Sequence, residues 1–379
     1  MEVVTFRFPT RIRCGVGARR SLESFAAAGP VKRPLLVTDG GLPTTEAYAL
    51  AAEQMDRIWP RSWQSFSGVH ANPREQDVDD AWQVFRGERC DAVIGLGGGS
   101  ALDAAKALRL RPAFPQRPLS QVPLDGLPER LTPMCAIPTT AGTGSEVGRS
   151  AVITLAETGQ KAVIGADSML PELAILDPEL TRGLPPHLTA ATGMDAMTHA
   201  VEAYVCPMYH PMCDGIALEA IRMVRTFLPL AVSDGSDLDA RMQMLVTASM
   251  GAVAFQKDLG AAHSLAHPLS TEFGVQHGLA NAIVLPHVVR FNGEADASLY
   301  TRVADALALE AAEDPAPQVA EFLEKLNRTI GITQRLRDLD VPRDSLPKLS
   351  RLAIADPCHR TNPRPCSEGD LRELYEKAW

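Results

Sequence analysis

The chain has 379 residues, of which 45% are hydrophobic and 22% are charged, and its formal net charge is −9 at pH 7. This length and composition are typical of a soluble globular protein with two domains, or with one large domain and a subdomain. Because phosphate recognition needs a basic surface, the acidic balance argues against nucleic acid as the main partner. No uncharged apolar run of about eighteen residues is present, which argues against a membrane span.

The N-terminal sequence MEVVTFRFPTRIRCG alternates like a β-strand and lacks the apolar core of a signal peptide. The seven cysteines are scattered and contain no CxxC pair, which is typical of free thiols rather than of a disulfide framework or a zinc ribbon. Both features predict a cytoplasmic protein.

Short apolar runs in the first half each end in a turn rich in glycine or threonine: RPLLVTDGG, CDAVIGLGGGS and MCAIPTTAG. Helical patterns alternate with them, such as AEQMDRIW, QDVDDAWQVFRG and ALDAAKALRL. This order predicts a doubly wound, parallel α/β sheet. The segment AVITLAETGQKAVIGAD predicts a β-hairpin added to it.

The amino-acid composition and the periodicity of apolar residues change near residues 184–186. Beyond this point Ala, Leu, Met and Glu dominate, and patterns such as GIALEAIRMVRTFLPLAV and DLDARMQMLVTASMGAVAF repeat with the period of a helix. We therefore expect two domains, an α/β domain over residues 1–184 and an all-α domain over residues 185–379.

The segment GLGGGSALDAAK, residues 95–106, follows a predicted strand and opens a predicted helix. Glycines at such a junction let backbone N–H groups approach a phosphate, and the N-terminus of the helix adds a favourable dipole. The segment contains neither GxxxxGK nor a full GxGxxG, so it matches neither a P-loop nor an orthodox Rossmann loop. A tight turn without a ligand is the alternative interpretation.

A second loop of this kind, PTTAGTGSE at residues 138–146, ends the next apolar strand and offers hydroxyls and glycines to the same diphosphate or ribose. Asp39 ends the strand PLLVTD. A carboxylate there can accept hydrogen bonds from the adenosine ribose and repel a 2′-phosphate, which favours NAD(H) over NADP(H). Turn formation is the alternative role for Asp39, but two loops and an acid together predict a dinucleotide site.

Seven of the nine histidines lie between residues 187 and 287. Asp195 and His199 are four residues apart, as are His263 and His267, so each pair lies on one face of a predicted helix, and His277 follows in VQHGLANAI. A carboxylate with imidazoles suits Fe²⁺, Zn²⁺ or Co²⁺. The spacing nominates five ligands where a tetrahedral site needs four, and it does not say which is surplus. Buried helices with hydrogen-bonded histidines are the alternative.

The chain resembles the iron-containing, group III alcohol dehydrogenases in a series of motifs that covers essentially its whole length: GGGSALDAAK, PTTAGTGSEV, LDPELT, ATGMDAMTHAVEAY, HSLAHPLSTEFGVQHGLANAIVLPHV and TNPRP…LYEKAW. The resemblance implies a dehydroquinate-synthase-like fold, with a dinucleotide-binding α/β domain at residues 1–184 and a helical metal-binding, catalytic domain at residues 185–379. It also implies a metal and a nicotinamide in the cleft between them.

The resemblance implies that one divalent metal, Fe²⁺ or alternatively Zn²⁺, is held by Asp195, His199, His263 and His277. His267 is then a catalytic histidine that lies near the nicotinamide and the substrate without ligating. The contacts implied for NAD(H) form a larger set: Asp39, Asn72, Gly97, Gly98, Gly99, Ser100, Asp103, Thr139, Thr140, Thr143, Ser145 and Lys161.

The sequence departs from the family pattern at three positions. Ala71 replaces the usual proline before Asn72, Ser270 stands where a glycine commonly follows HPL, and Asp258 replaces a glycine often seen in FQKGLG. The last two lie close in sequence to the histidine-bearing helix, so they bear on the choice of substrate rather than on the chemistry.

Together these features predict reversible hydride transfer between NAD(H) and a small alcohol: a primary alcohol gives an aldehyde, and a ketone would come from a secondary alcohol. We expect a homo-oligomer, a dimer, that binds neither nucleic acid nor membrane. Arg149 and Lys257 are candidates to face the substrate, which would favour one with a carboxylate or phosphonate; the alternative is that both are solvated or face the cofactor.

Three other functions use similar motifs. Maleylacetate reductases are related, but their metal site is typically degraded, whereas every ligand position is intact here. A lyase of the dehydroquinate synthase type uses metal and NAD with internal hydride transfer, and so makes no net NADH. A metal or nucleotide sensor would bind the same ligands without turnover.

Overall fold

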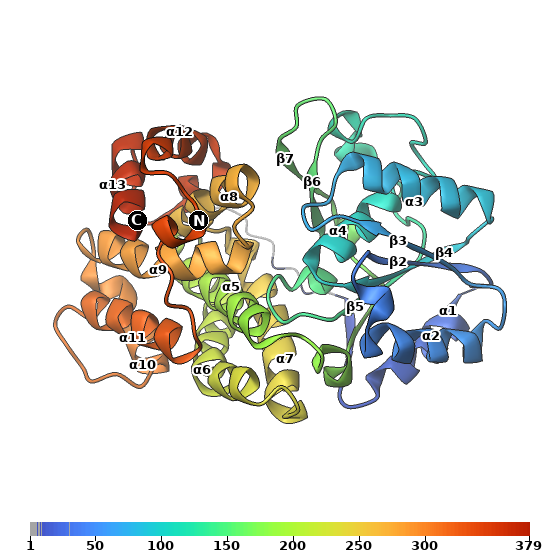
Figure 1. Ribbon diagram of the computed structural model, residues 1–379, viewed down its shortest axis with the longest axis horizontal. Helices are drawn as coiled ribbons and strands as arrows, with labels where there is room; N and C mark the ends of the chain where they lie inside the picture. The colour runs from blue at the N-terminus through green and yellow to red at the C-terminus, as the bar shows by residue number, and fades with distance from the viewer. Residues whose placement is uncertain (1–5, 7, 9, 30) are drawn as a thin grey trace. The chain divides into compact units, whose positions relative to one another are not determined.

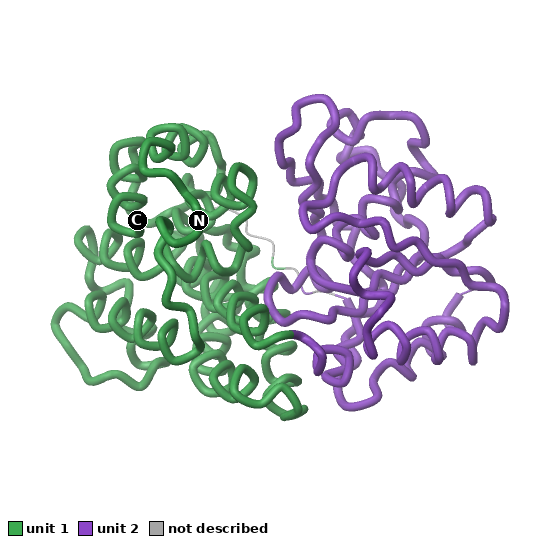
Figure 2. Tube along the Cα trace, viewed as in Figure 1, with its two compact units in different colours: residues 1–7, 185–379 green, residues 8–184 purple. Residues whose placement is uncertain are grey.

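The structure is a computed structural model that describes the whole chain apart from residues 1–5, 7, 9 and 30 (Figure 1). Part of the N-terminal strand expected at residues 1–15 therefore lies outside the described residues. The chain forms two compact units, one made of residues 8–184 and one that contains residues 185–379 together with Phe6 (Figure 2). Each unit is described below by itself.

The first unit contains a six-stranded parallel sheet with the strand order β1-β8-β5-β4-β2-β3. Its strands are β1 (Arg11–Cys14), β2 (Pro34–Asp39), β3 (Gln64–Val69), β4 (Ala92–Gly97), β5 (Met134–Pro138) and β8 (Leu173–Leu176). The neighbouring strands β4 and β5 are apolar and buried along their whole length. Such strands are typical of parallel sheets, because helices cover both faces.

The helices of this unit are α1 (Leu22–Ala28), α2 (Glu46–Ile58), α3 (Glu75–Gly87) and α4 (Gly99–Leu108). Leu36 of β2 packs in the core that α1 and α2 cover, whereas its neighbour Leu35 packs in the core under α3 and α4. Successive side chains of a strand point to opposite faces, so helices cover both sides of the sheet. The predicted doubly wound fold is confirmed, and so is the hairpin, which is formed by β6 (Ser150–Thr154) and β7 (Lys161–Gly165).

The second unit is helical, as its sequence predicts. Its helices are α5 (Pro186–Val205), α6 (Pro211–Ser233), α7 (Leu238–Ala254), α8 (Ala261–Phe273), α9 (His277–Gly293), α10 (Thr301–Ala306), α11 (Ala316–Thr329), α12 (Leu346–Ala355) and α13 (Glu368–Ala378). Helix α5 packs against α6, α7 and α9 and is buried along most of its length. None of the helices in the described part of the chain is long and apolar enough to cross a membrane.

Helix α9 approaches the central helix α5 unusually closely at Gly278. A Cβ atom at Gly278 would lie 2.1 Å from the carbonyl oxygen of Ala191 on α5. Only a residue without a side chain fits there. The contact brings His277, the first residue of α9, beside the middle of α5, where Asp195 lies.

Candidate functional site

Helix α5 carries a row of ionisable side chains on one buried face. Asp195, His199 and Glu202 follow each other at intervals of four and three residues, which places them on the same side of the helix. All three side chains are almost completely buried, with 3–4% of each residue exposed. Charged groups at this depth need partners, because burial of an isolated charge is costly.

Helices α8 and α9 supply those partners. The Nε2 atoms of His263 and His277 lie 3.8 Å and 3.4 Å from Asp195 Oδ1, and one ligand atom from each of these three residues lies within 4.8 Å of the others. His199 Nε2 is 3.9 Å from the same Oδ1, and the His199 ring stacks on that of His263 with 4.7 Å between centroids. The structure therefore brings together the four residues that the resemblance nominates as ligands.

Glu202 fixes the orientation of the buried His263. Its Oε2 lies 2.5 Å from His263 Nδ1, and its Oε1 accepts a 2.6 Å hydrogen bond from the backbone N–H of Ala262, in the first turn of α8. Since a carboxylate only accepts, Nδ1 carries the proton, and Nε2 is the ring nitrogen that faces Asp195. This carboxylate–imidazole arrangement orients histidines at metal centres.

Sequence analysis missed Glu202 and also Asn281. Asn281 is fully buried on α9, and its Nδ2 donates to Asp195 Oδ1 at 2.9 Å and lies 3.3 Å and 3.2 Å from the Nε2 atoms of His263 and His277. The spacing contained a signal for both, because Glu202 continues the face of Asp195 and His199, and Asn281 follows His277 by four residues.

The donor set of this cluster fits a divalent cation. One carboxylate oxygen and two imidazole nitrogens face each other around a small volume, and all three lie within 3.3 Å of the Asn281 amide nitrogen. Although burial opposes ionisation, the neighbouring His199, His277 and His263 lower the pKa of Asp195. An ionised carboxylate with neutral imidazoles is the ligand chemistry of Fe²⁺, Zn²⁺ and Co²⁺.

His267 lies one turn after His263 and outside this group. Its Nδ1 is 2.7 Å from Asp356 Oδ2, and its ring stacks on His277 at 5.3 Å. His267 also lies in a second group with Asp356 and Cys358. Burial and the adjacent Asp356 raise the pKa of the Cys358 thiol well above its usual value. Because thiolates rather than thiols bind metals, the second group is the poorer metal site.

Burial opposes ionisation of Asp356, but the hydrogen bond to His267 and the backbone N–H of Cys358 lower the pKa of this carboxyl group. Asp356 therefore holds His267 through Nδ1 and leaves Nε2 free of this interaction. Sequence analysis did not find Asp356, since it lies 89 positions along the chain from His267.

The nucleotide-type motifs meet in the α/β unit at the carboxyl ends of three adjacent strands. Asp39 ends β2, Gly97 ends β4 and Pro138 ends β5. Helix α2 follows β2 onto one face of the sheet and α4 follows β4 onto the other, so the ends of β2 and β4 form a topological switch point. Open α/β sheets bind their ligands at such points.

The two loops at these strand ends pack on each other through bare glycines. A Cβ at Gly99 would lie 2.6 Å from Thr143 Oγ1, and one at Gly98 would lie 3.4 Å from Thr140 Oγ1. The backbone N–H of Thr139 donates to the carbonyl of Gly97, whose φ of 146° suits only glycine. The glycines therefore set the backbone of the first turn of α4, whose free N–H groups are the expected phosphate contacts.

Asp39 forms a turn, which is one of the two roles considered for it, and its contact with a ribose stays a prediction. Its Oδ1 accepts hydrogen bonds from the backbone N–H groups of Gly41 and Leu42 at 2.9 Å and 3.1 Å, which closes a turn. Its Oδ2 faces the glycine loop, 3.4 Å from the position of a Cβ at Gly97. One oxygen therefore shapes the turn while the other is directed to the expected nucleotide position.

Asp103 and Ser145 instead bond within the protein. Ser145 Oγ donates to Asp103 Oδ1 at 2.5 Å, and Asp103 Oδ2 accepts from the Val152 backbone at 2.8 Å. The buried Lys106 lies 3.1 Å from Asp103 Oδ1 and donates to the carbonyl of Ser150. These contacts tie α4 to the second loop and to the hairpin, so they position the glycine loop.

The remaining nominated cofactor residues are Ser100, Asn72 and Lys161. Ser100 Oγ donates to the carbonyl of Ala71 at 2.5 Å, which joins the glycine loop to the turn that carries the exposed Asn72. Lys161 begins β7 opposite Thr154 of β6.

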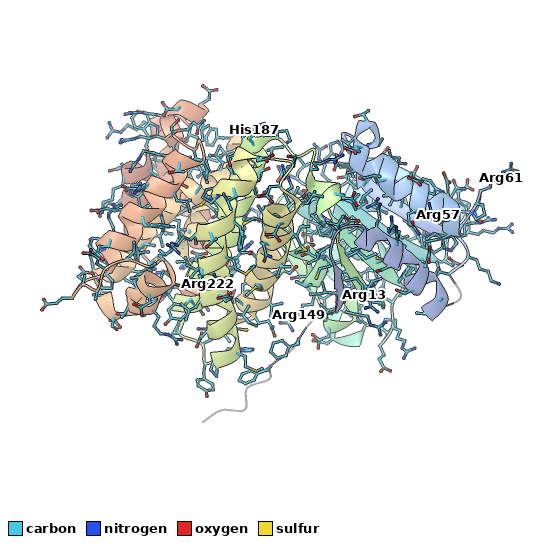
Figure 3. The ribbon with its side chains drawn as sticks, turned by 90° about the horizontal axis from the view of Figure 1, so that it is seen from below. Arg13, Arg57, Arg61, Arg149, His187 and Arg222 are labelled. Atoms are coloured by element: carbon cyan, nitrogen blue, oxygen red, sulfur yellow. The ribbon has the colours of Figure 1, made fainter. Side chains whose placement is uncertain are left out.

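The two candidate cations for substrate binding differ sharply. Lys257 is buried in the helical unit, where its Nζ lies 2.5 Å from Asp214 and 3.2 Å from the carbonyl of Tyr204. Of the two possibilities left open for Lys257, the structure disfavours contact with a substrate anion, because this lysine is buried and already paired with Asp214. Arg149, which is labelled in Figure 3, is exposed. It belongs to the α/β unit, where it pairs with Asp167 at 3.2 Å.

The two departures near the histidine helix have local structural effects. Asp258 adopts φ 83° and ψ −177°, a conformation that is essentially confined to glycine. The hydroxyl of Ser270 is buried on α8 without a hydrogen-bond partner among the described residues. The first substitution therefore introduces backbone strain, and the second leaves a polar atom unsatisfied.

Comparison with known proteins gives the same picture for both units. The family model described as iron-containing alcohol dehydrogenase matches residues 9–178, and the C-terminal model of the Fe-containing alcohol dehydrogenase family matches residues 189–379. The 4-hydroxybutyrate dehydrogenase of Cupriavidus necator is 36% identical over 382 residues, which cover 97% of this chain and 98% of the relative.

Solved structures agree over the full length as well. A 1,3-propanediol oxidoreductase aligns with a TM-score of 0.93 and 34% identity, covering 100% of both chains. The sulfoacetaldehyde reductase from Bifidobacterium kashiwanohense in complex with NAD⁺ aligns with a TM-score of 0.89 and 28% identity, covering 100% of this chain and 99% of the other. The similarity thus includes both units and the segment that joins them.

Proposed function

The chain belongs to the iron-containing alcohol dehydrogenase family and interconverts alcohols and aldehydes with NAD(H), and we propose that it acts on a small primary alcohol through one divalent metal. The α/β unit is the dinucleotide-binding domain and the helical unit is the metal-binding domain. The observation that carries this proposal is the convergence of Asp195, His263 and His277 on one point, with His199 beside them.

Asp195, His199, His263 and His277 hold the metal in this proposal, and Fe²⁺ is the ion that the family favours. Lewis acidity, supplied by the bound metal, makes the hydroxyl of the alcohol easier to deprotonate. Glu202 keeps the lone pair of His263 directed at the site, and Asn281 restrains Asp195 through a hydrogen bond.

His267 carries the proton in the proposed reaction. Asp356 holds its Nδ1, so Nε2 is the atom that takes the proton of the alcohol and passes it toward solvent. The electron pair of the carbinol C–H bond passes as hydride to NAD⁺, which yields the aldehyde, NADH and one proton. The strand-end loops and the Oδ2 of Asp39 bind the dinucleotide, and the Asp39 carboxylate favours NAD(H) over NADP(H).

The substrate that we propose is a short alcohol whose aldehyde carries an acidic group. Two similar proteins support this class, since one is named for 4-hydroxybutyrate and the other for sulfoacetaldehyde, although a third is named for the uncharged 1,3-propanediol. Lys257 is excluded as the cation for that group. Arg149 remains the candidate, because its guanidinium is half exposed.

The assembly and location that we propose are a homodimer in the cytoplasm. All seven cysteines are free, which agrees with a reducing compartment. Strand β1 lies at one edge of the sheet and its four residues are exposed, so it can pair with a second copy.

A panel of aldehydes assayed for NADH oxidation, with iron-loaded and with chelated protein, tests the function. We expect turnover that requires the metal. Full activity of the chelated protein would contradict the metal role, and no change in NADH with any aldehyde would favour a lyase. Succinic semialdehyde should react more efficiently than butyraldehyde, and equal efficiency would contradict the acidic-substrate proposal alone.

A further inference from the structure

The helical unit contains a pocket that plays no part in the function above. It has a volume of about 350 Å³. Its lining comes from α9, from α11 and the segment that follows it, and from α13: Ile283, Pro286, His287, Glu324, Asn327, Arg328, Ile332, Thr333, Gln334, Arg335, Lys377 and Ala378. A volume of this size suits a small metabolite.

A proline in α9 builds one wall of the pocket. Pro286 has no N–H, so it cannot donate to the carbonyl of Ala282 four residues earlier. The side chain of Asn327 on α11 replaces that donor, with its Nδ2 2.7 Å from the Ala282 oxygen. The bond fixes the spacing of α9 and α11, and it leaves Asn327 Oδ1 without a hydrogen-bond partner among the described residues.

Positive charge dominates the lining, although the whole chain carries −9. Arg328, Arg335 and Lys377 come from three different segments. In the described part of the chain no carboxylate pairs with either arginine, and Lys377 pairs only with the exposed Glu373, at 2.8 Å. The one acid in the lining, Glu324, is engaged by Arg290 at 2.7 Å.

His287 lies between these charges on the α9 wall. No group among the described residues hydrogen-bonds to its ring. Burial, together with the charges of Arg290, Lys377 and Arg335, lowers the pKa of His287 to about 4, although Glu324 opposes this shift. Its imidazole is therefore neutral at pH 7, with one nitrogen available to donate and the other to accept.

We propose that this pocket is a binding site for a small metabolite with clustered anionic oxygens, of the kind that a phosphate monoester or a dicarboxylate presents. Arg328, Arg335 and Lys377 bind the oxygens, and Ile283, Pro286 and Ile332 contact the carbon skeleton.

The pocket is distinct from both parts of the proposed active site. The dinucleotide loops belong to the other unit. His277 and His287 are ten residues apart on α9, which corresponds to about 15 Å along the helix axis. The inference therefore stands whether or not the proposed function is correct.

Titration calorimetry with glycerol 3-phosphate and with succinate tests the site, at constant ionic strength, with and without saturating NADH. We expect at least one probe to bind saturably with a Kd of about 1 mM or tighter. The probe that binds more tightly identifies the class as phosphate ester or dicarboxylate. NADH should leave the binding unchanged, since the dinucleotide loops are elsewhere.

The double variant Arg335→Gln/Lys377→Gln should weaken binding by about tenfold or more, because it removes two charge-assisted hydrogen bonds. Both side chains are exposed, so the fold should persist. Arg337→Gln is the matched control, as Arg337 is exposed close by in the chain but does not line the pocket. The NMR signal of the His287 ring should shift with the probe, and His287→Gln identifies that signal.

Three results would overturn the proposal: no saturable binding of either probe, an equal loss in Arg337→Gln, which would indicate only a diffuse field, or displacement of the probe by NADH, which would place it in the dinucleotide loops.

Discussion

The candidate sites of the two units depend on opposite features of their side chains. In the α/β unit the site depends on glycines, because Gly98 and Gly99 have no side chain and so let the backbone of one loop pack against threonine side chains of the other. Polar groups there, such as Asp103 and Ser145, bond to each other. In the helical unit the site consists of side chains from α5, α8 and α9 that converge and are held by further polar groups. One site is therefore sensitive to added atoms and the other to removed atoms.

The largest expected effect is on the helical unit alone. His263→Ala removes a buried ligand, so the metal content should fall to background and turnover by about a thousandfold or more, since Lewis-acid assistance contributes several kcal/mol. Binding of NADH should not change. Metal analysis and fluorescence titration measure the two properties. His187→Ala is the control, because His187 is exposed in the first turn of α5. Retention of metal by His263→Ala would contradict the proposed difference between the two units.

Glu202→Gln tests the support of the ligands rather than a ligand. The amide keeps an oxygen for the N–H of Ala262 but loses the charge that holds Nδ1 of His263. Metal affinity should fall about 10–100-fold, as is usual for such supporting groups. Competition with a calibrated chelator measures it. Glu219→Gln on α6 is the control and should have no effect, because Glu219 is exposed and paired with Arg222. Equal metal affinities of the two variants would show that Glu202 does not support the ligands.

Gly99→Ala makes the complementary change in the α/β unit. The new methyl group would lie 2.6 Å from Thr143 Oγ1, so the second loop must move away from the first turn of α4. NADH should bind about tenfold more weakly, equivalent to about 1.4 kcal/mol, while the metal content stays normal. Gly87→Ala, where a Cβ would meet nothing within 4 Å, is the control. Unchanged NADH affinity in Gly99→Ala would show that the loop contact is unimportant.

The smallest effect concerns the backbone just before α8. Asp258→Gly removes a residue from a conformation that glycine adopts without strain, and the lost side chain bonds only the neighbouring N–H of Leu259. The free energy of unfolding should rise by about 1 kcal/mol, as measured by urea denaturation. Asp340→Gly should gain less, because Asp340 has φ 56° and ψ 28°, which aspartate tolerates. A lower free energy of unfolding in Asp258→Gly would contradict the claim that the backbone conformation of Asp258 destabilises the protein.

Local patterns were sufficient to predict the fold. The alternation of apolar runs and helical patterns predicted the doubly wound sheet, and the TG turn predicted the hairpin of β6 and β7. The order of the strands was not predicted. Pairing such as that of β1 with β8 joins residues about 160 positions apart, and neither segment contains a local sequence signal for its partner. The grouping of Phe6 with the helical unit is a long-range contact of the same kind.

The site was predictable where spacing on one helix sufficed. The i, i+4 relation nominated Asp195 with His199, but spacing alone did not separate His267 from the ligands. In the structure Asp356 holds His267 from a distant segment, which supports the prediction that His267 is not a ligand. The role of Lys257 stayed open for the same reason, since Asp214 on α6 is a partner that the sequence around Lys257 does not contain.

The central claim is that one metal binds to the α5, α8 and α9 cluster and not to the neighbouring group of His267, Asp356 and Cys358. Anomalous X-ray diffraction from iron-loaded crystals, recorded at the iron absorption edge, tests it most directly. The account predicts one strong peak, about 2.0–2.2 Å from Asp195 and from the Nε2 atoms of His199, His263 and His277. A peak bonded to His267 or Cys358, or no peak at Asp195, would contradict it.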